Sequence, residues 1–491
     1  MARGTLILAV SAALSIAALP VQAQSGSYGV ASPAILNFRG AVAQTSPPQV
    51  VSLKNTGDSE LTFSNISTSG DFAITTNYCE NGVKAGTHCN VYVAFTPSGP
   101  GTETGTLTFV DNASNSPQTV SLSGTIGEIV LYNFAGSSDG LYPESSLTFD
   151  SAGNLYGTTT LGGPFGNGTI YELSPNGNGG WNKSLLYAFT GAADGGYPTS
   201  NLVFDSAGNL YGKAYGGGAY GYGVVFELSL AEGNWAEAVL YNFASDSGDE
   251  ANPGNLIMDP AGNLYGTIDA GVFELTPSVG GWTNQMIFSV ETISGLTMDA
   301  AGNIFGTGIL PDGWGTYQLS PNGNGAWNPT TLHIFAGVGH DGDAAWGTPV
   351  ADLAGNVFGT TCFGGTYGGG IVYKLRLIAE GKNKGLWTES ILHSFKGGLD
   401  GACPMAGLAL DAAGNIYGST MEAGYFSYGT VFELASPQGK RDYKEKLLWS
   451  FNGADGEQPY SSLILDGAGN LYGAGMQGGA NTRGIIFEVI P

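Results

Sequence analysis

The sequence predicts an all-β protein in which a small β-sandwich precedes a seven-bladed β-propeller closed by its own N-terminal strand. The phrase DSAGNLYGTT, Asp150 to Thr159, returns six more times with small changes, at a spacing of about 50 residues. Between these copies lie short strand-like runs separated by Gly-rich turns, which is typical of propeller blades. The repeat region also begins on an isolated fourth strand and ends on a third strand, so its two ends can complete one blade.

The first 23 residues have the layout of a cleavable signal peptide, with Arg3, an apolar run and small residues up to Ala23. The apolar run is too short for a membrane span, and no later stretch reaches that length. We therefore expect a soluble exported protein, either secreted, periplasmic or at the cell surface. The formal net charge of −24 makes nucleic acid an improbable partner, because such a surface repels phosphate.

Residues 28–126 contain short alternating runs, such as QVVSLKN and GTLTFVDN, separated by turn residues. This pattern predicts a two-sheet sandwich. Cys79 and Cys89 bracket a short loop and are predicted to form a disulfide, since His88 alone offers too little for a metal site. The phrases LKNTGDSELTFSNIS and HCNVYVAFTPSGPGTETGTLTF resemble the Ig-like domains of the abnormal-spindle and hydin type and the bacterial choice-of-anchor D domains. This resemblance implies an Ig-like domain that acts as a spacer or in adhesion.

Residues 128–491 carry the repeat. Each copy begins with Asp-x-Ala-Gly-Asn, and the aspartates are Asp150, Asp205, Asp259, Asp299, Asp352, Asp411 and Asp466. Within the first unit, SSLTF, NLYGTT, GTIYELSP and SLLYAF read as four successive strands. The opening EIVLYNF reads as a fourth strand and the final GIIFEVIP as a third, so Val130–Phe134 should pair with Ile485–Val489.

The repeated phrase is interpreted as architecture, because every unit contains it. The Asp can accept hydrogen bonds from its own turn, in which Gly takes a positive φ and Asn tolerates a similar geometry. The following aromatic residue, such as Tyr156, is expected to pack between blades, and the next glycine, Gly157, to let neighbouring sheets approach.

The segment LYNFAGSSDGLYPESSLTFDSAGNLYGTTTLGGPFGNGTIYELSP resembles the bacterial GloVer tandem repeat of the choice-of-anchor group. The resemblance extends over all seven units and is weakest in the fourth and fifth. It implies no established reaction or ligand.

Neither a catalytic set nor a metal site is predicted, because the first strands of the blades carry no His and no carboxylate cluster. His333 and His393 stand where other units have Tyr or Trp and are interpreted as packing residues. Cys362 and Cys403 are predicted to form a disulfide between blades.

Two sets of loops are expected at one rim of the propeller, and they supply the candidate ligand-binding residues. The first set brings the acidic residues Asp139, Asp194, Asp341, Asp400 and Asp455. The second brings aromatic residues, of which Tyr222, Tyr367 and Tyr428 are the candidates. Aromatic rings beside carboxylates suit the capture of carbohydrate or peptide, and several carboxylates could hold a structural Ca²⁺. The alternative is that these residues serve turn chemistry and gap filling only.

The function that this pattern favours is an exported, non-catalytic binding or adhesion protein, with carbohydrate or an extracellular protein as its partner. One alternative is an extracellular polysaccharide lyase or hydrolase that uses rim carboxylates. Another is a structural surface protein without a small ligand. A propeller fold does not decide among them.

Overall fold

The computed structural model describes residues 25–40, 45–97, 102–177, 180–231, 233–244, 251–292, 294–337, 340–437 and 442–491. These residues form β-strands, turns and short 3₁₀ segments, and no α-helix occurs among them. They contain no helix long and apolar enough to cross a membrane. The chain divides into a first unit that ends at Thr125 and a second unit over Ile126–Pro491. The predicted signal peptide, residues 1–23, lies outside the described residues.

The first unit is a sandwich of two antiparallel sheets, as predicted. One sheet has the strand order β1 (Gly29–Ser32), β3 (Gln49–Asn55), β6 (His88–Phe95), β5 (Phe72–Asn77). The other has the order β2 (Ile35–Gly40), β8 (Gln118–Ile126), β7 (Thr102–Asp111), β4 (Phe63–Thr68). Alternate residues of the strands, such as Val91 of β6 and Phe109 of β7, are fully buried between the sheets. Cys79 and Cys89 form the predicted disulfide within this core.

Seven antiparallel sheets of four or five strands make up most of the described part of the second unit. Sheet 1 contains β10 (Thr148–Phe149), β11 (Leu155–Thr159), β12 (Thr169–Pro175) and β13 (Trp181–Ala188). Sheet 2 contains β14 (Gly196–Pro198), β15 (Val203–Phe204), β16 (Leu210–Gly216), β17 (Val224–Ala231) and β18 (Asn234–Asn242). Sheet 3 contains β19 (Ala251–Met258), β20 (Leu264–Ile268), β21 (Gly271–Ser278) and β22 (Gly281–Ser289). Sheet 4 contains β23 (Glu291–Thr292), β24 (Thr297–Met298), β25 (Ile304–Leu310), β26 (Gly313–Pro321) and β27 (Trp327–Ile334).

The remaining sheets follow the same plan. Sheet 5 contains β29 (Val350–Ala351), β30 (Val357–Thr361), β32 (Ile371–Leu377) and β33 (Trp387–Ser394). Sheet 6 contains β34 (Ala409–Leu410), β35 (Ile416–Thr420), β36 (Thr430–Ala435) and β37 (Lys444–Ser450). Sheet 7 contains β38 (Glu457–Pro459), β39 (Ile464–Leu465), β40 (Leu471–Gln477), β41 (Ile485–Val489) and β9 (Glu128–Asn133). A small two-stranded sheet pairs β28 (Gly342–Asp343) with β31 (Phe363–Gly364).

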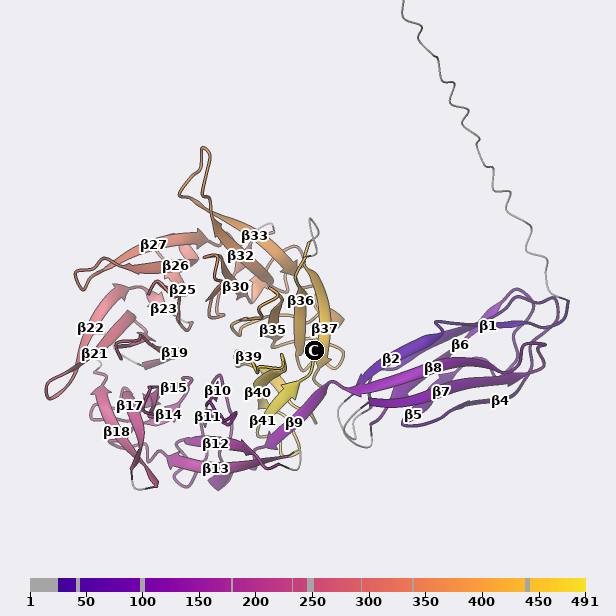
Figure 1. Cartoon of the computed structure of the whole chain (residues 1–491), viewed down its shortest axis with the longest axis horizontal. Helices are drawn as coiled ribbons and strands as arrows, with labels where there is room; N and C mark the ends of the chain where they lie inside the picture. The colour runs from indigo at the N-terminus through magenta and orange to yellow at the C-terminus, as the bar shows by residue number, and fades with distance from the viewer. Residues whose placement is uncertain are drawn as a thin grey trace, which may run out of the picture. The chain divides into compact units, whose positions relative to one another are not determined.

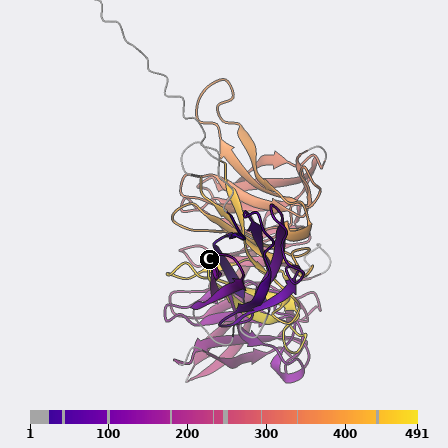
Figure 2. The same cartoon turned by 90° about the vertical axis from the view of Figure 1, so that its right-hand side faces the viewer.

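The seven sheets follow one another around a common centre, with the first strands innermost and the fourth strands outermost (Figure 1; Figure 2 gives the view from the side). Buried apolar clusters lie between neighbouring sheets. Tyr156 of sheet 1, for example, packs with Leu202 and Leu210 of sheet 2. Another cluster joins Tyr472 of sheet 7 to Tyr171 of sheet 1, so the last sheet packs against the first.

The strand that opens the repeat region pairs with the last strand of the chain. Antiparallel pairing between β41 and β9 sets Ile485 opposite Asn133 and Val489 opposite Glu128. This confirms the predicted pairing of the two ends. Sheet 7 thereby gains its fourth strand from the N-terminal side of the repeat region.

The repeated Asp-x-Ala-Gly-Asn phrase forms a hydrogen-bonded turn between the first and second strands of every sheet. In the first copy, Asp150 Oδ1 accepts hydrogen bonds from the backbone N–H groups of Ala152 and Asn154, both at 2.9 Å. Asp150 Oδ2 accepts one from the side-chain amide of Asn154 at 2.8 Å. The same three bonds occur in all of the other copies. These bonds agree with the architectural interpretation of the phrase.

The glycine that follows the aromatic residue has a role other than the one expected. A Cβ on Gly157 would overlap the ring of Tyr171, its cross-strand partner in the same sheet. Glycine is therefore required because an aromatic ring of the third strand lies over it, and not because two sheets approach there. The same overlap occurs at Gly212, Gly266, Gly306, Gly359, Gly418 and Gly473, each with a Tyr or Phe of its own sheet.

The second disulfide joins neighbouring sheets. Cys362 directly follows β30 of sheet 5, and Cys403 precedes β34 of sheet 6. This is the predicted covalent link between two repeats.

Candidate functional site

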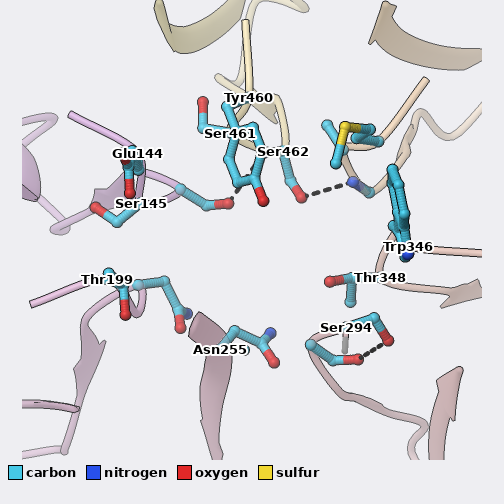
Figure 3. Close-up of a pocket in the computed structure, with 17 residues that line it drawn as sticks. Glu144, Ser145, Thr199, Asn255, Ser294, Trp346, Thr348, Tyr460, Ser461 and Ser462 are labelled. Carbon is cyan, nitrogen blue, oxygen red and sulfur yellow. Dashed lines mark hydrogen bonds between the residues drawn. The ribbon is translucent and has the colours of Figure 1, made fainter. Parts of the chain in front are cut away.

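A cavity of about 430 Å³ lies where the seven sheets converge. Each sheet contributes to its lining through the residues at or just before its innermost strand. The lining comprises Glu144, Ser145, Ser146, Thr199, Asn201, Gly254, Asn255, Ser294, Gly295, Trp346, Thr348, Met405, Ala406, Gly407, Tyr460, Ser461 and Ser462 (Figure 3). We refer to this space as the axial cavity.

Small residues line the axial cavity because the chain segments come very close together there. A Cβ on Gly295 would lie 2.5 Å from the side-chain oxygen of Asn255, and one on Gly407 would lie 2.7 Å from Ser462 Oγ. Both distances are shorter than Cβ atoms tolerate. Bulky residues at these positions would push neighbouring sheets apart.

Hydrogen bonds connect the lining segments of neighbouring sheets. Asn201 Oδ1 of sheet 2 accepts from Leu256 N of sheet 3 at 2.9 Å. Ser462 Oγ of sheet 7 accepts from Gly407 N of sheet 6 at 2.9 Å, while the backbone N–H of Ser462 donates to Ser146 Oγ of sheet 1 at 3.0 Å. Because neighbours fix one another in this way, the polar wall of the cavity is preorganised.

Two other polar side chains of the wall, Thr199 and Glu144, make no hydrogen bond to a neighbouring lining segment among the described residues. Thr199 Oγ1 is buried and makes no hydrogen bond within the described part of the chain. Glu144 Oε2 accepts a hydrogen bond from Thr160 Oγ1 at 3.0 Å.

In the view of Figure 3, Glu144 and Trp346 lie on opposite sides of the cavity and Tyr460 lies between them. Trp346 is held by edge contacts with Trp314 and Phe363, at ring-centroid distances of 6.3 and 5.9 Å.

Among the described lining residues of the axial cavity, Glu144 has the one carboxyl group and the other side chains are uncharged. Burial raises the pKa of Glu144, an effect that the bond from Thr160 partly offsets. Burial and the negative charge of Glu144 raise the pKa of Tyr460, so its hydroxyl is a neutral donor at physiological pH. Hydroxyl, amide and aromatic groups with a single carboxyl suit a neutral ligand rich in hydroxyl groups.

The acidic residues predicted at the rim lie at junctions between neighbouring sheets instead of in the axial cavity. Each accepts a hydrogen bond from a backbone N–H of its own loop, and these pairs are Asp139 with Ala135, Asp194 with Thr190, Asp341 with Ala336, Asp400 with Lys396 and Asp455 with Asn452. In four of them, the second contact is an aromatic residue of the preceding fourth strand: Tyr132, Tyr187, His333 or His393. These carboxylates thus stabilise their own loops and, in four cases, tie the loop to the preceding fourth strand.

The three tyrosines predicted at the rim belong to three different repeats. Tyr222 is partly buried against the cluster between sheets 2 and 3. Tyr367 is 56% exposed with Lys396 Nζ 5.4 Å from its ring centre, and Tyr428 is 40% exposed. None of the eight candidate rim residues lines the axial cavity. A ligand site at the rim therefore stays a prediction.

The axial cavity was not predicted from the sequence, because functional residues at the centre were expected only within the first strands. The lining comes mostly from the residues just before those strands. The available signal was the repeated small or polar pair at that point, as in ESSL, TSNL, PGNL and YSSL.

Comparisons with known proteins identify both parts of the chain. The model of the Gloeobacter/Verrucomicrobia repeat matches residues 119–308 and 292–491. The chain belongs to the Gloeobacter/Verrucomicrobia repeat family. The model of the HYDIN/CFA65/VesB-like Ig-like domain matches residues 31–125, so the first unit of this family member is Ig-like. Both resemblances found in the sequence are confirmed.

Solved structures similar to this Gloeobacter/Verrucomicrobia repeat protein are distant. The extracellular domain of a protein described as a hybrid two-component system from B. thetaiotaomicron has a TM-score of 0.48 and 13% identity. The match covers 78% of this chain, which spans only 44% of the length of that one. A Hadza microbial sialidase has a TM-score of 0.40 and 14% identity, covering 83% of this chain and 77% of the other. The PQQ-bound aldose sugar dehydrogenase of Streptomyces coelicolor has a TM-score of 0.37 and 13% identity, covering 74% and 98%. The sequence matches none of the curated proteins with which it was compared.

Proposed function

We propose that residues 128–491 are a seven-bladed β-propeller, closed by β9, that binds a neutral carbohydrate of one or two sugar units in the axial cavity. In this proposal, residues 28–126 serve as a spacer or second contact module, and residues 1–23 direct export. The two disulfides support an oxidising location, either periplasmic, secreted or at the cell surface.

One observation carries the binding proposal. Six of the seven sheets direct uncharged hydroxyl or amide side chains at one space, and Trp346 and Tyr460 add aromatic surface to it. Its volume of about 430 Å³ lies in the range of roughly 300–1,000 Å³ common for small-molecule sites. Aromatic rings with a polar edge can stack on the apolar face of a sugar while hydroxyl groups bond its rim.

The alternative of a polysaccharide lyase or hydrolase that uses rim carboxylates has less support. Asp194 and Asp400, for instance, each accept hydrogen bonds from their own loop and from a fourth-strand side chain, and they lie at different sheet junctions. A pair of acids that acts on one glycosidic bond must flank that bond from a single cleft.

Calorimetric titration of the purified chain with neutral mono- and disaccharides tests the proposal. We expect binding by at least one sugar, its loss in Trp346→Ala, and about a tenfold weaker affinity in Tyr460→Phe, which removes one hydroxyl donor. Tyr367→Ala at the rim serves as the matched control and should bind normally. Sugar binding that is lost in Tyr367→Ala but unchanged in both cavity variants would place the ligand at the rim. Turnover of a glycan by the chain would contradict the non-catalytic assignment.

A further inference from the structure

Four loops between sheets, those of Asp139, Asp194, Asp341 and Asp400, build the same local arrangement, and the side chain that completes it differs among them. At the junction of sheets 7 and 1, Asp139 Oδ2 accepts from Ala135 N at 2.7 Å, and Asp139 Oδ1 accepts from Tyr132 Oη at 2.8 Å. Lys183 of β13 completes this site. Its Nζ lies 2.9 Å from Asp139 Oδ1 and 2.7 Å from the Asp139 carbonyl oxygen. The chain therefore supplies a cation of its own at this junction.

The junction of sheets 4 and 5 has the same frame without that cation. Asp341 Oδ2 accepts from Ala336 N at 2.7 Å, as in the Asp139 loop. His333 of β27 takes the place of Tyr132, and Glu389 of β33 takes the place of Lys183. The equivalence of Lys183 and Glu389 follows from strand register, because they face the corresponding residues Leu173 and Leu375.

Three metal-ligating side chains converge at this second junction. His333 Nε2 lies 3.4 Å from Asp341 Oδ1 and 3.8 Å from Glu389 Oε2. One ligand atom from each residue lies within 4.8 Å of the other two. Ligand atoms around a tetrahedral zinc ion are about 3.3 Å apart, because each lies about 2.0 Å from the metal. The observed spacing therefore needs only small side-chain movements to hold such an ion.

The surroundings fit an ion better than they fit a closed hydrogen-bond network. Glu389 Oε1 is buried and makes no hydrogen bond within the described residues. Asp341 is held in place by backbone donors on both oxygens, from Ala336 and from Gly342 at 2.7 Å. The three side chains are 16–23% exposed, so an ion and a completing water can reach them.

We propose that His333, Asp341 and Glu389 bind a Zn²⁺ ion that joins the outer strands of sheets 4 and 5. Imidazole favours zinc, and two carboxylates supply the remaining protein ligands, with water in the fourth position. The ion takes the structural role that the Lys183 ammonium group has at the junction of sheets 7 and 1.

The neighbouring repeat offers a matched control. His393 of β33 lies 3.2 Å from Asp400 Oδ1, so a histidine and an aspartate are paired there as well. The residue equivalent to Glu389 in this repeat is Glu445. The ligand atoms of His393, Asp400 and Glu445 do not all lie within 4.8 Å of one another in the described structure. The charge of Lys396 acts on both Asp400 and Glu445. A cation already present beside these carboxylates disfavours a metal ion.

The test is calorimetric titration of the EDTA-treated full chain with Zn²⁺, together with thermal unfolding with and without the metal. We expect one equivalent to bind and the melting temperature to rise. The double variant His333→Tyr/Glu389→Lys rebuilds the junction of sheets 7 and 1, so it should fold, bind at least about tenfold more weakly and lose the thermal shift. His393→Tyr should bind as the unaltered chain does. The proposal is overturned if the unaltered chain binds no Zn²⁺, or if the double variant binds it equally well.

Discussion

Glu128 of β9 and Asp455, in the loop between β37 and β38, are two buried acids that lie close enough to interact electrostatically. Glu128 is 0% exposed and Asp455 is 1% exposed. Both oxygens of Glu128 and the Oδ2 atom of Asp455 make no hydrogen bond within the described part of the chain. Burial, with a contribution from Asp455, raises the pKa of Glu128, and burial raises the pKa of Asp455 to about 7.

This pair predicts that the second unit loses stability as the pH rises. The folded chain keeps the Asp455 proton to a higher pH than the unfolded chain, whose pKa is near 3.8. The stabilisation is complete below the lower value and is lost as the pH rises through about 7, with a total of about 4 kcal/mol. Urea unfolding at pH 5 and pH 8 measures the part of this loss that occurs above pH 5, about 3 kcal/mol. Fluorescence reports on the second unit alone, since all eight Trp residues lie there.

Asp455→Asn isolates this contribution. The amide oxygen can still accept from Asn452 N but cannot ionise, so the fall in unfolding free energy between pH 5 and pH 8 should shrink. Asp466→Asn is the control, because the pKa of Asp466 is lowered and that carboxyl is ionised throughout. An equal pH dependence in Asp455→Asn and in the unaltered chain would show that this acid does not titrate in the range.

The turn motif predicts a sharp contrast between adjacent residues. Asp205 accepts hydrogen bonds from the backbone of Ala207 and from both the backbone and side chain of Asn209. Asp205→Ala should therefore lower the free energy of unfolding by about 1–3 kcal/mol. Ser206→Ala, at the exposed second position of the same turn, should change it by less than about 0.5 kcal/mol. Similar values for the two variants in urea unfolding would refute the architectural role of the aspartate.

Replacement of Tyr by Phe over the motif glycines should have opposite effects on stability at two positions, Tyr171 and Tyr373. Tyr171 Oη is buried without a hydrogen bond in the described structure, whereas Tyr373 Oη lies 2.9 Å from Thr316 Oγ1. Tyr171→Phe should be neutral or stabilising, because it removes an unsatisfied buried hydroxyl. Tyr373→Phe should destabilise the second unit by about 1 kcal/mol. Equal effects in thermal unfolding would contradict these bonding assignments.

The link between sheets 5 and 6 predicts a redox-dependent stability. Cys362 and Cys403 are 41 positions apart, and a closed loop of that length stabilises by about 4 kcal/mol in the chain-entropy model. The variant Cys362→Ala/Cys403→Ala should lower the urea midpoint of the tryptophan signal by a corresponding amount. A thiol reductant should lower the urea midpoint of the unaltered chain but leave the midpoint of this variant unchanged. A midpoint of the variant equal to that of the oxidised chain would mean that packing between the sheets alone sets the stability.

Much of the fold could be predicted because the information is local and repeated. The side chain of Asp150 accepts hydrogen bonds from Ala152, Asn154 and Tyr156 of its own repeat phrase, and the pairing of β9 with β41 follows from counting strands at the two ends. The role of Gly157 could not be read in this way, because it depends on which residue the third strand places over it. The axial cavity was hidden for a similar reason. Ser146, Asn201 and Ser462 look like turn residues in isolation, and only their convergence from three sheets makes a binding surface.

A crystal structure of the chain with a bound neutral sugar would show directly where the ligand lies. We expect ligand density in the axial cavity, in contact with Trp346 and Tyr460. Density against Tyr367 or Tyr428, with the cavity holding only water, would contradict it and return the ligand to the rim loops.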